Sequence, residues 1–318
     1  MRCEDSREQQ EARAVTKQWR GVFTIPCTPF DDQGRLDFDS LRNEVDFCLA
    51  AGGHGIVYPV NASEFWTLTD DERMKAVELV VKQVNGKVPV VVGAAGVSDP
   101  HAVALAKHAQ EVGADAIIAM PPYVRPVGES DIYAYYRALS EAITIPIFIQ
   151  NHDAPAGTRL SPAFCAKLVN ELPYVDWIKE ETFPPGHAIT AELKLCNPNK
   201  LKGVMGGVAG RYILDEYERG ACGTMPACET TDIASKVWNL LDAGKKREAR
   251  DLFNRLLPVL NYEAVVPGVY KAVLKRRGII KSDYLRSHHG NPLDQYDHAE
   301  LGRIFADIED LLTLAPFK

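Results

Sequence analysis

The sequence lacks the features of most membrane-spanning and disulfide-stabilised proteins. No run of about 18 apolar residues occurs, so we expect no transmembrane helix. The seven cysteines are scattered and include no Cys-x-x-Cys pair, which argues against a disulfide framework and against a zinc site. Residues 1–18 are polar and charged and contain no apolar core of a secretion signal. We therefore expect a loosely ordered tail and a cytoplasmic protein.

Catalytic motifs with a fixed pattern are also missing. The chain contains no Gly-x-Ser-x-Gly elbow, no Walker loop and no His-Glu-x-x-His motif. His288, His289 and His298 fall in a polar region near the C-terminus and are interpreted as surface residues, so we expect no metal and no cofactor. The net charge of −7 argues against nucleic acid as a partner, because phosphate recognition requires a basic surface.

What is present is the composition of a well-cored globular protein, with 46% apolar and 25% charged residues. Eight short apolar segments lack strict alternation of apolar and polar residues, which is typical of strands buried on both faces of a sheet. They span residues 21–29, 55–60, 88–95, 114–120, 145–150, 175–179, 202–206 and 221–226. Each is followed by an amphipathic stretch with helical spacing, at 39–51, 70–84, 100–112, 129–143, 161–172, 186–195, 210–219 and 229–241.

Eight strand–helix units in succession predict an α/β fold, a (β/α)8 TIM barrel. A doubly wound sheet normally carries a Gly-x-Gly-x-x-Gly turn after its first strand, and none follows residues 21–29. Beyond residue 242 only helical stretches follow, at 245–260, 263–277 and 298–314, with a polar loop at 282–296. We therefore expect a tail at 1–18, a barrel at 19–242 and a C-terminal three-helix extension at 243–318.

Lys179 is the most informative candidate, because functional groups of a TIM barrel lie at the carboxyl ends of its strands. It ends an apolar segment, where a solvated lysine is unexpected. Desolvation disfavours the ammonium form, so a lysine in an apolar barrel can offer a free amine to a carbonyl. The alternative is a structural lysine that pairs with Glu180 or Glu181. From position alone, both interpretations stay open.

Two other strand ends suggest anion binding. Asn61-Ala62-Ser63 offers backbone N–H groups and polar side chains that suit a carboxylate, although an ordinary turn before a helix explains it as well. Gly207-x-x-Gly210 has the glycine spacing of phosphate-binding barrels, and close helix packing explains it equally well.

Four motifs fall in the order of one known family. They are Thr28-Pro29-Phe30, a small polar turn ending in Ser63-Glu64, Pro122-Tyr123, and Ile178-Lys179-Glu180. From about residue 20 to residue 315 the chain resembles the dihydrodipicolinate synthase and N-acetylneuraminate lyase family of Schiff-base barrels. The resemblance implies that Lys179 condenses with the keto group of pyruvate or of another 2-keto acid.

The chain departs from this family at several positions. The family's Gly-Thr-Thr-Gly-Glu turn here reads Val60-Asn61-Ala62-Ser63-Glu64. The tyrosine that relays protons in the family corresponds to Gln150, and a second tyrosine of the synthase corresponds to Val124. The loop that carries the synthase's arginine has none before Arg159. These departures argue against dihydrodipicolinate synthesis itself.

The preferred hypothesis is a lyase that cleaves or dehydrates a 2-keto-3-deoxy sugar acid, or a related hydroxylated 2-keto acid, through an imine on Lys179. A water or His152 would carry protons, and Gln150, which cannot titrate, would orient a water or bond the substrate. The residues expected to bind substrate are Asn61, Ala62, Ser63, Met225 and Gly207.

Three alternatives remain open at this point. They are pyruvate condensation of the dihydrodipicolinate synthase type, an inactive barrel that binds a keto acid, and an enzyme for a phosphorylated substrate at Gly207-x-x-Gly210. The expected partner is a small 2-keto acid rather than a nucleic acid or a membrane. The family resemblance also implies a homo-oligomer, either a dimer or a tetramer.

Overall fold

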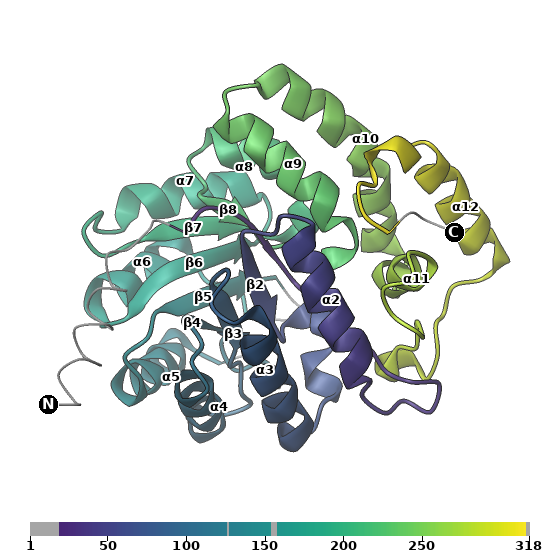
Figure 1. Cartoon of the computed structure of the whole chain (residues 1–318). Coiled ribbons are helices and arrows are strands. Elements are labelled where there is room, and N and C mark those ends of the chain that lie inside the picture. The colour runs from purple at the N-terminus through teal and green to yellow at the C-terminus, as the bar shows by residue number, and fades with distance from the viewer. Residues whose placement is uncertain (1–18, 126, 154–157, 316–318) are drawn as a thin grey trace, which may run out of the picture.

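A computed structural model describes residues 19–125, 127–153 and 158–315, so the predicted tail at 1–18 lies outside the described residues. Eight strands form one closed barrel in sequence order, and β1 pairs with β8 in parallel to close the ring (Figure 1). The strands are β1 Gly21–Thr24, β2 Gly55–Tyr58, β3 Val90–Gly93, β4 Ala116–Ala119, β5 Ile147–His152, β6 Val175–Glu181, β7 Gly203–Gly206 and β8 Gly223–Thr224. The prediction of a (β/α)8 barrel is confirmed.

Strands β5 and β6 are longer than the sequence predicted. Their expected ends, at residues 150 and 179, are each two residues short of the observed ends, His152 and Glu181. The two strands remain paired over this extra length, with Gln150 opposite Lys179 and His152 opposite Glu181. Pairing with a neighbouring strand is a tertiary effect that extends a strand beyond its apolar segment. The extension places Glu181 inside the sheet.

A helix overlaps each of the eight stretches predicted to be helical, with boundaries shifted by a few residues. The helices are α2 Phe38–Ala50, α3 Asp70–Val84, α4 Asp99–Glu111, α5 Glu129–Ala142, α6 Pro162–Glu171, α7 Pro185–Leu195, α8 Ile213–Glu218 and α9 Thr231–Asp242. Local signals start some of them: Thr69 and Glu72 form a capping box at α3, and Ser161 caps α6 ahead of a first-turn proline.

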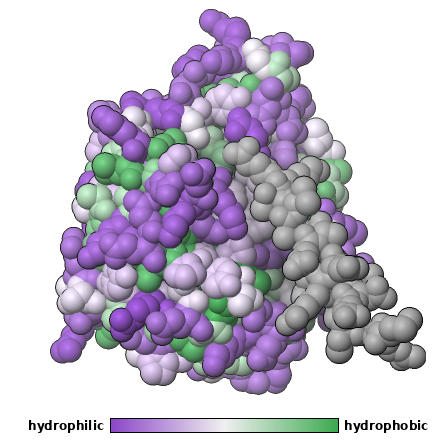
Figure 2. All heavy atoms as spheres, turned by 90° about the vertical axis from the view of Figure 1, so that its left-hand side faces the viewer, coloured by the Kyte–Doolittle hydropathy of each residue, from purple (hydrophilic) through white to green (hydrophobic). Residues whose placement is uncertain are grey.

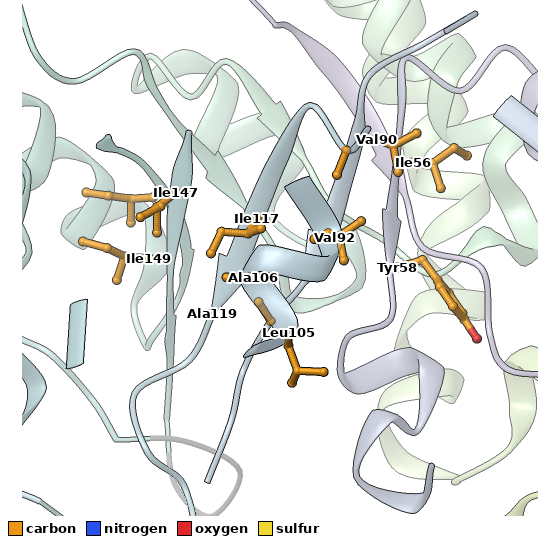
Figure 3. Close-up of a cluster of buried hydrophobic side chains, with 14 of the residues drawn as sticks. Ile56, Tyr58, Val90, Val92, Leu105, Ala106, Ile117, Ala119, Ile147 and Ile149 are labelled. Carbon is orange, nitrogen blue, oxygen red and sulfur yellow. The ribbon is translucent and has the colours of Figure 1, made fainter. Parts of the chain in front are cut away.

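The core has two layers because successive strand residues point to opposite faces of the barrel. Ile117 packs outward against the helices, whereas Ile118 belongs to the cluster inside the barrel, and both are buried. Figure 3 shows the outer layer, in which Leu105 and Ala106 of α4 lie over strand side chains. Burial on both faces explains why the strand segments show no polar alternation.

Aromatic rings close the amino-terminal end of the barrel. The Trp19 ring stacks on Trp177 at a centroid distance of 5.4 Å and on Phe148 at 6.3 Å. Both partners lie inside the barrel, on strands β6 and β5. The interior below the functional end is therefore filled by side chains.

The helices after α9 pack beside the barrel (Figure 1). They are α10 Lys246–Val265, α11 Val269–Arg276 and α12 Gln295–Ala306, with the 3-10 turns η5 Arg286–His288 and η6 Glu309–Leu311. A separate apolar cluster joins Trp238 of α9 to Phe253 of α10 and Phe305 of α12. The predicted break after residue 260 is wrong: α10 continues to Val265, and the chain turns at Gly268, whose φ of +88° favours glycine.

The described surface agrees with the composition. The face shown in Figure 2 is mostly hydrophilic, with apolar residues in small, scattered patches. Within residues 19–125, 127–153 and 158–315, no helix has the length and apolar content needed to cross a bilayer. The six cysteines of these segments are all buried thiols, and no group of three or more His, Cys, Asp or Glu side chains there is arranged to hold a metal ion.

Candidate active site

A cavity of about 340 Å³ lies at the carboxyl ends of the strands. This volume is near the lower end of the range for small-molecule pockets. Five residues that the sequence singled out line it together: Asn61, Ala62, His152, Lys179 and Met225. The structure therefore gathers the carboxyl ends of β5 and β6 and the loops after β2 and β8 around one space.

Lys179 lies deep in this cavity. Its side chain projects from β6 into the barrel interior, one pleat above Trp177, and the residue is only 2% exposed. Its Nζ lies 3.1 Å from Oε2 of Glu181. Residues two apart on a strand share a face, which is why these two side chains meet. The sequence offered Glu180 and Glu181 as partners for the lysine, and the structure selects Glu181.

Glu181 is the functional candidate that sequence reasoning missed. Its Oε2 accepts a hydrogen bond from Nε2 of Gln150 at 2.8 Å, and its Oε1 accepts one from the backbone N–H of Val208 at 3.2 Å. Burial disfavours the carboxylate, but the Lys179 and His152 charges and these two donors outweigh it and hold the pKa of Glu181 below its usual range. Its i, i+2 spacing from Lys179 is the signal that could have identified it.

Gln150 contacts the site through its hydrogen bond to Glu181. The residue is buried at 1% exposure, and its side chain lies opposite Lys179 in the strand register. Because an amide does not titrate, Gln150 orients the carboxylate rather than carrying a proton.

Glu180 belongs to a different environment, on the outer face of the barrel. Its Oε2 accepts from Asn151 at 2.8 Å, and its Oε1 accepts from the backbone and hydroxyl of Thr182. Burial raises the pKa values of both Glu180 and Glu192, whose carboxyl groups contact one another. This pair lies behind the strand, away from the cavity.

The glycines at the end of β7 and directly after it make room for carboxyl groups. A Cβ on Gly206 would lie 1.9 Å from Oε2 of Glu216, and one on Gly207 would lie 2.4 Å from Cγ of Glu181. Burial raises the pKa of Glu216 to about 8, with the charges of Asp215 and Glu181 adding to the effect. Close approach of acidic side chains accounts for these glycines, and the surroundings disfavour a phosphate.

The turn after β2 divides its residues between the cavity and the core. Asn61 and Ala62 line the cavity, in a 3-10 turn, η1 Asn61–Ser63. Ser63 is fully buried and its hydroxyl donates to the carbonyl of Pro26 at 2.7 Å, so it braces the turn. The N–H groups of Ser63 and Glu64 donate within the turn, to Val60 and Asn61.

Glu64, the last residue of the motif, connects this turn to the C-terminal helices. It is 1% exposed and forms an ion pair with Lys271 of α11, which is fully buried. The backbone N–H and hydroxyl of Ser287 also donate to Glu64, at 3.0 and 2.8 Å. The Lys271 ammonium lies 4.5 Å from the centroid of the Phe30 ring. The extension therefore holds the substrate-side turn in place.

The other predicted site residues contribute less direct chemistry. His152 is half-buried, and its Nδ1 lies 2.7 Å from the carbonyl oxygen of Asp153. The backbone N–H of Met225 already donates to Gly206 in the sheet at 3.0 Å, so Met225 lines the cavity without offering that donor. Arg159 donates to the carbonyl of Phe183 at 3.0 Å and lies 3.4 Å from Asp153. His288, His289 and His298 lie in or near η5 and in α12, outside the cavity.

Comparisons with known proteins agree with this geometry. The model of the dihydrodipicolinate synthetase family matches residues 18–306. An L-2-keto-3-deoxyarabonate dehydratase from Azospirillum brasilense is 33% identical over 305 residues, which cover 93% of this chain and 97% of the relative. A 4-hydroxy-tetrahydrodipicolinate synthase from Pelodictyon phaeoclathratiforme is 31% identical, over 85% of this chain and 91% of the relative. The crystal structure of a dihydrodipicolinate synthase from Rhodopseudomonas palustris superimposes with a TM-score of 0.84 at 26% identity, covering 92% and 99% of the two chains.

Proposed function

Because the chain belongs to the dihydrodipicolinate synthetase family, whose members are lyases, we propose that it dehydrates a 2-keto-3-deoxy sugar acid through an imine on Lys179. One observation carries the proposal: the buried amine of Lys179 lies 3.1 Å from a carboxylate, Glu181, inside a small cavity at the carboxyl end of the barrel. The dehydratase from A. brasilense, matched over nearly its whole length, supports the same reaction class.

Lys179 forms the imine in this mechanism. Its ammonium passes a proton to Glu181, and the free amine attacks C2 of the keto acid. Glu181 returns this proton to the carbonyl oxygen, which takes a second proton from the attacking nitrogen and leaves as water, and an iminium ion joins the lysine to the substrate. The contact of 3.1 Å between Nζ and Oε2 allows this proton transfer without a mobile carrier.

Glu181 takes the role of the missing tyrosine as acid and base. The iminium acidifies the C3 proton, which the Glu181 carboxylate accepts, and the bonding electrons move toward the nitrogen as an enamine forms. The protonated carboxyl then gives a proton to the C4 hydroxyl, which leaves as water. Gln150 and the Val208 N–H keep the carboxylate in place throughout. Hydrolysis of the imine returns the free lysine.

The turn after β2 supplies the first recognition site for the substrate. Asn61 and Ala62 line the cavity, and we assign to them the carboxylate of the keto acid. Three further residues support this arrangement indirectly. Ser63 braces the turn through Pro26, Gly207 leaves room for Glu181, and Met225 forms part of the cavity wall. The family resemblance further supports a homo-oligomer, either a dimer or a tetramer, which light scattering would test.

Two alternatives are less well supported. Condensation of the synthase type needs a site for a second carboxylate, and Arg159 is already engaged by Asp153 and Phe183. An inactive binding protein would need no acid or base beside the lysine, yet Glu181 supplies one where the family tyrosine is absent. Aldol cleavage shares the imine, but Glu181 then removes the proton of the C4 hydroxyl, the C3–C4 bond breaks as its electrons form the enamine, and C3 is protonated before hydrolysis.

Borohydride trapping tests the proposal directly. Incubation with pyruvate or a 2-keto-3-deoxy pentonic acid, followed by reduction, should leave a stable secondary amine on Lys179 that peptide mass spectrometry locates. Lys179→Met should abolish the adduct. Lys202→Met is the matched control, because Lys202 also pairs with a carboxylate, Asp176 at 2.5 Å, but does not line the cavity. Without borohydride, a product lighter by one water supports dehydration, and release of pyruvate supports cleavage. No adduct at Lys179 would overturn the imine mechanism.

A further inference from the structure

A second acidic group lines the cavity and comes from the C-terminal extension. Glu263 lies in the last turn of α10, and it shares the cavity with Lys179 and Glu181. Its carboxyl group contacts that of Glu229, which lies in the 3-10 turn η4 Cys228–Thr230 after β8. The mechanism above uses neither residue.

This carboxyl pair has unsatisfied hydrogen-bonding capacity. Glu229 is 1% exposed, and neither of its side-chain oxygens accepts a hydrogen bond from an N–H or hydroxyl group in the described part of the chain. The Oε2 of Glu263 is likewise buried without a donor. Burial raises the pKa of each residue, and the unpartnered oxygens keep free acceptor lone pairs. Buried acceptors of this kind favour a ligand that brings hydroxyl donors.

The acidic residues around the cavity disfavour a second anionic group on the ligand. Its lining contains the basic residues Lys179, His152 and Arg211 and the acidic residues Asp153, Glu181 and Glu263. The charge of Arg211 is already directed in part at Glu263, whose pKa it lowers against the effect of burial. The Arg211 Nε also donates to the carbonyl of Val208 at 3.2 Å. The carboxylate next to the keto group balances the positive charge of the iminium on Lys179. A second carboxylate, at the far end of the ligand, would face the carboxyl groups of Glu263 and Glu229.

We propose that Glu263, backed by Glu229, is a specificity-determining residue that binds the hydroxyl groups at the far end of the substrate. The enzyme then selects keto acids with an uncharged, hydroxylated tail over keto diacids. This inference rests on the proposed function, because it places the other end of the substrate on Lys179. It also gives the C-terminal extension a part in substrate selection.

The test compares ligands that share the keto acid and differ in the tail. Borohydride trapping yields the half-saturating concentrations of a 2-keto-3-deoxy pentonic acid, of the corresponding 2-keto-3-deoxy diacid and of pyruvate, which has no tail. For Glu263→Met, the ratio of the pentonic acid value to the pyruvate value should rise about tenfold or more, because the hydroxyl acceptor is lost. Glu263→Gln keeps an acceptor without the charge, so it should restore most of the ratio and bind the diacid several-fold more tightly than wild type. Glu248→Met, an exposed position on the same helix, should leave the ratio at its wild-type value.

The outcomes separate this inference from the proposed function. If the wild-type protein traps neither pyruvate nor the sugar acid, the imine mechanism fails, and the inference fails with it. If wild type traps both and Glu263→Met leaves their ratio unchanged, Glu263 is a structural residue and the inference alone is overturned. Should Glu263→Met not fold, Glu263→Gln decides, and unchanged affinity for the diacid contradicts the proposal.

Discussion

The Nζ of Lys179 lies 3.1 Å from Oε2 of Glu181, two residues further along the same strand. Both side chains are almost fully buried and point into the barrel. An amine and a carboxylate held this closely can exchange a proton directly, so in the proposed mechanism one strand supplies both the imine-forming group and its acid–base partner. The pair and the hydrogen bond from Gln150 that holds it can each be tested by substitution.

Replacement of the Glu181 carboxylate should remove proton transfer and keep the fold. Glu181→Gln preserves size and hydrogen bonding to Gln150, and we expect kcat to fall by about 10²–10⁴-fold. Since the pKa of Glu181 lies below its usual range, the wild-type enzyme should keep its base ionised down to unusually acidic pH. The acid limb of kcat/KM should therefore lie below the range of an ordinary glutamate and should be absent in the variant. A variant with wild-type kcat would remove Glu181 from the mechanism.

Gln150 should tune Glu181 rather than take part in the chemistry. Gln150→Leu removes the donor at 2.8 Å, which stabilises the ionised carboxylate, so the pKa of Glu181 should rise. The acid limb of kcat/KM should then move up by about one pH unit. Gln83→Leu is the control, because Gln83 donates to Asp46 at 2.7 Å on the surface. An unshifted pH profile in Gln150→Leu would show that this hydrogen bond does not position the base.

Removal of Lys271 alone from its ion pair with Glu64 should destabilise the fold strongly, whereas removal of both charges should cost less. Lys271→Met leaves the Glu64 carboxylate buried without its cation, and we expect a loss of about 3–5 kcal/mol in the free energy of unfolding in urea. The double variant with Glu64→Gln should recover part of this loss, because no uncompensated charge remains. Lys275→Met breaks the more exposed pair with Asp283 and should cost about 1 kcal/mol or less. Equal losses in both single variants would contradict the buried-charge argument.

Glu216 should make the folded state less stable as pH rises. Its pKa is raised to about 8, whereas the unfolded chain has the ordinary value of 4.5. Between these values the folded protein binds a proton that the unfolded chain has lost, so the free energy of unfolding falls with increasing pH. Glu216→Gln cannot ionise, so its stability relative to wild type should increase steadily between about pH 5 and pH 8. Glu218→Gln, on the exposed side of α8, should show no such trend in parallel unfolding curves.

Much of the fold follows from local patterns in the chain. Apolar segments without alternation predict strands buried on both faces, and all eight lie in the barrel wall. Capping residues such as Thr69 and Ser161 mark helix starts because their side chains bond to backbone N–H groups nearby in sequence. The ends of β5 and β6 and the path of α10 could not be predicted, since pairing and packing with distant residues decide them.

In the candidate site too, some features follow from the sequence and others depend on tertiary contacts. Position on a strand is enough to single out Lys179, and motif order is enough to suggest the imine. The directions of the Asn61 and Ser63 side chains are not local properties: Asn61 lines the cavity, while Ser63 bonds to Pro26 on another loop. The lowered pKa of Glu181 also depends on hydrogen bonds from Gln150 of β5 and from the backbone N–H of Val208, after β7.

By itself, the sequence determined the barrel, the lysine and the absence of the family's proton-relaying tyrosine. The barrel follows from apolar periodicity and the lysine from its position at a strand end, which short segments carry within themselves, whereas the missing tyrosine is what the resemblance to the family implies. Only the tertiary structure decided which acid lies beside Lys179, and it brought Glu263 from a distant helix into the same cavity. Burial, charge and hydrogen bonding set the state of a carboxyl group, and these arise only when the strands close and the C-terminal helices pack beside them.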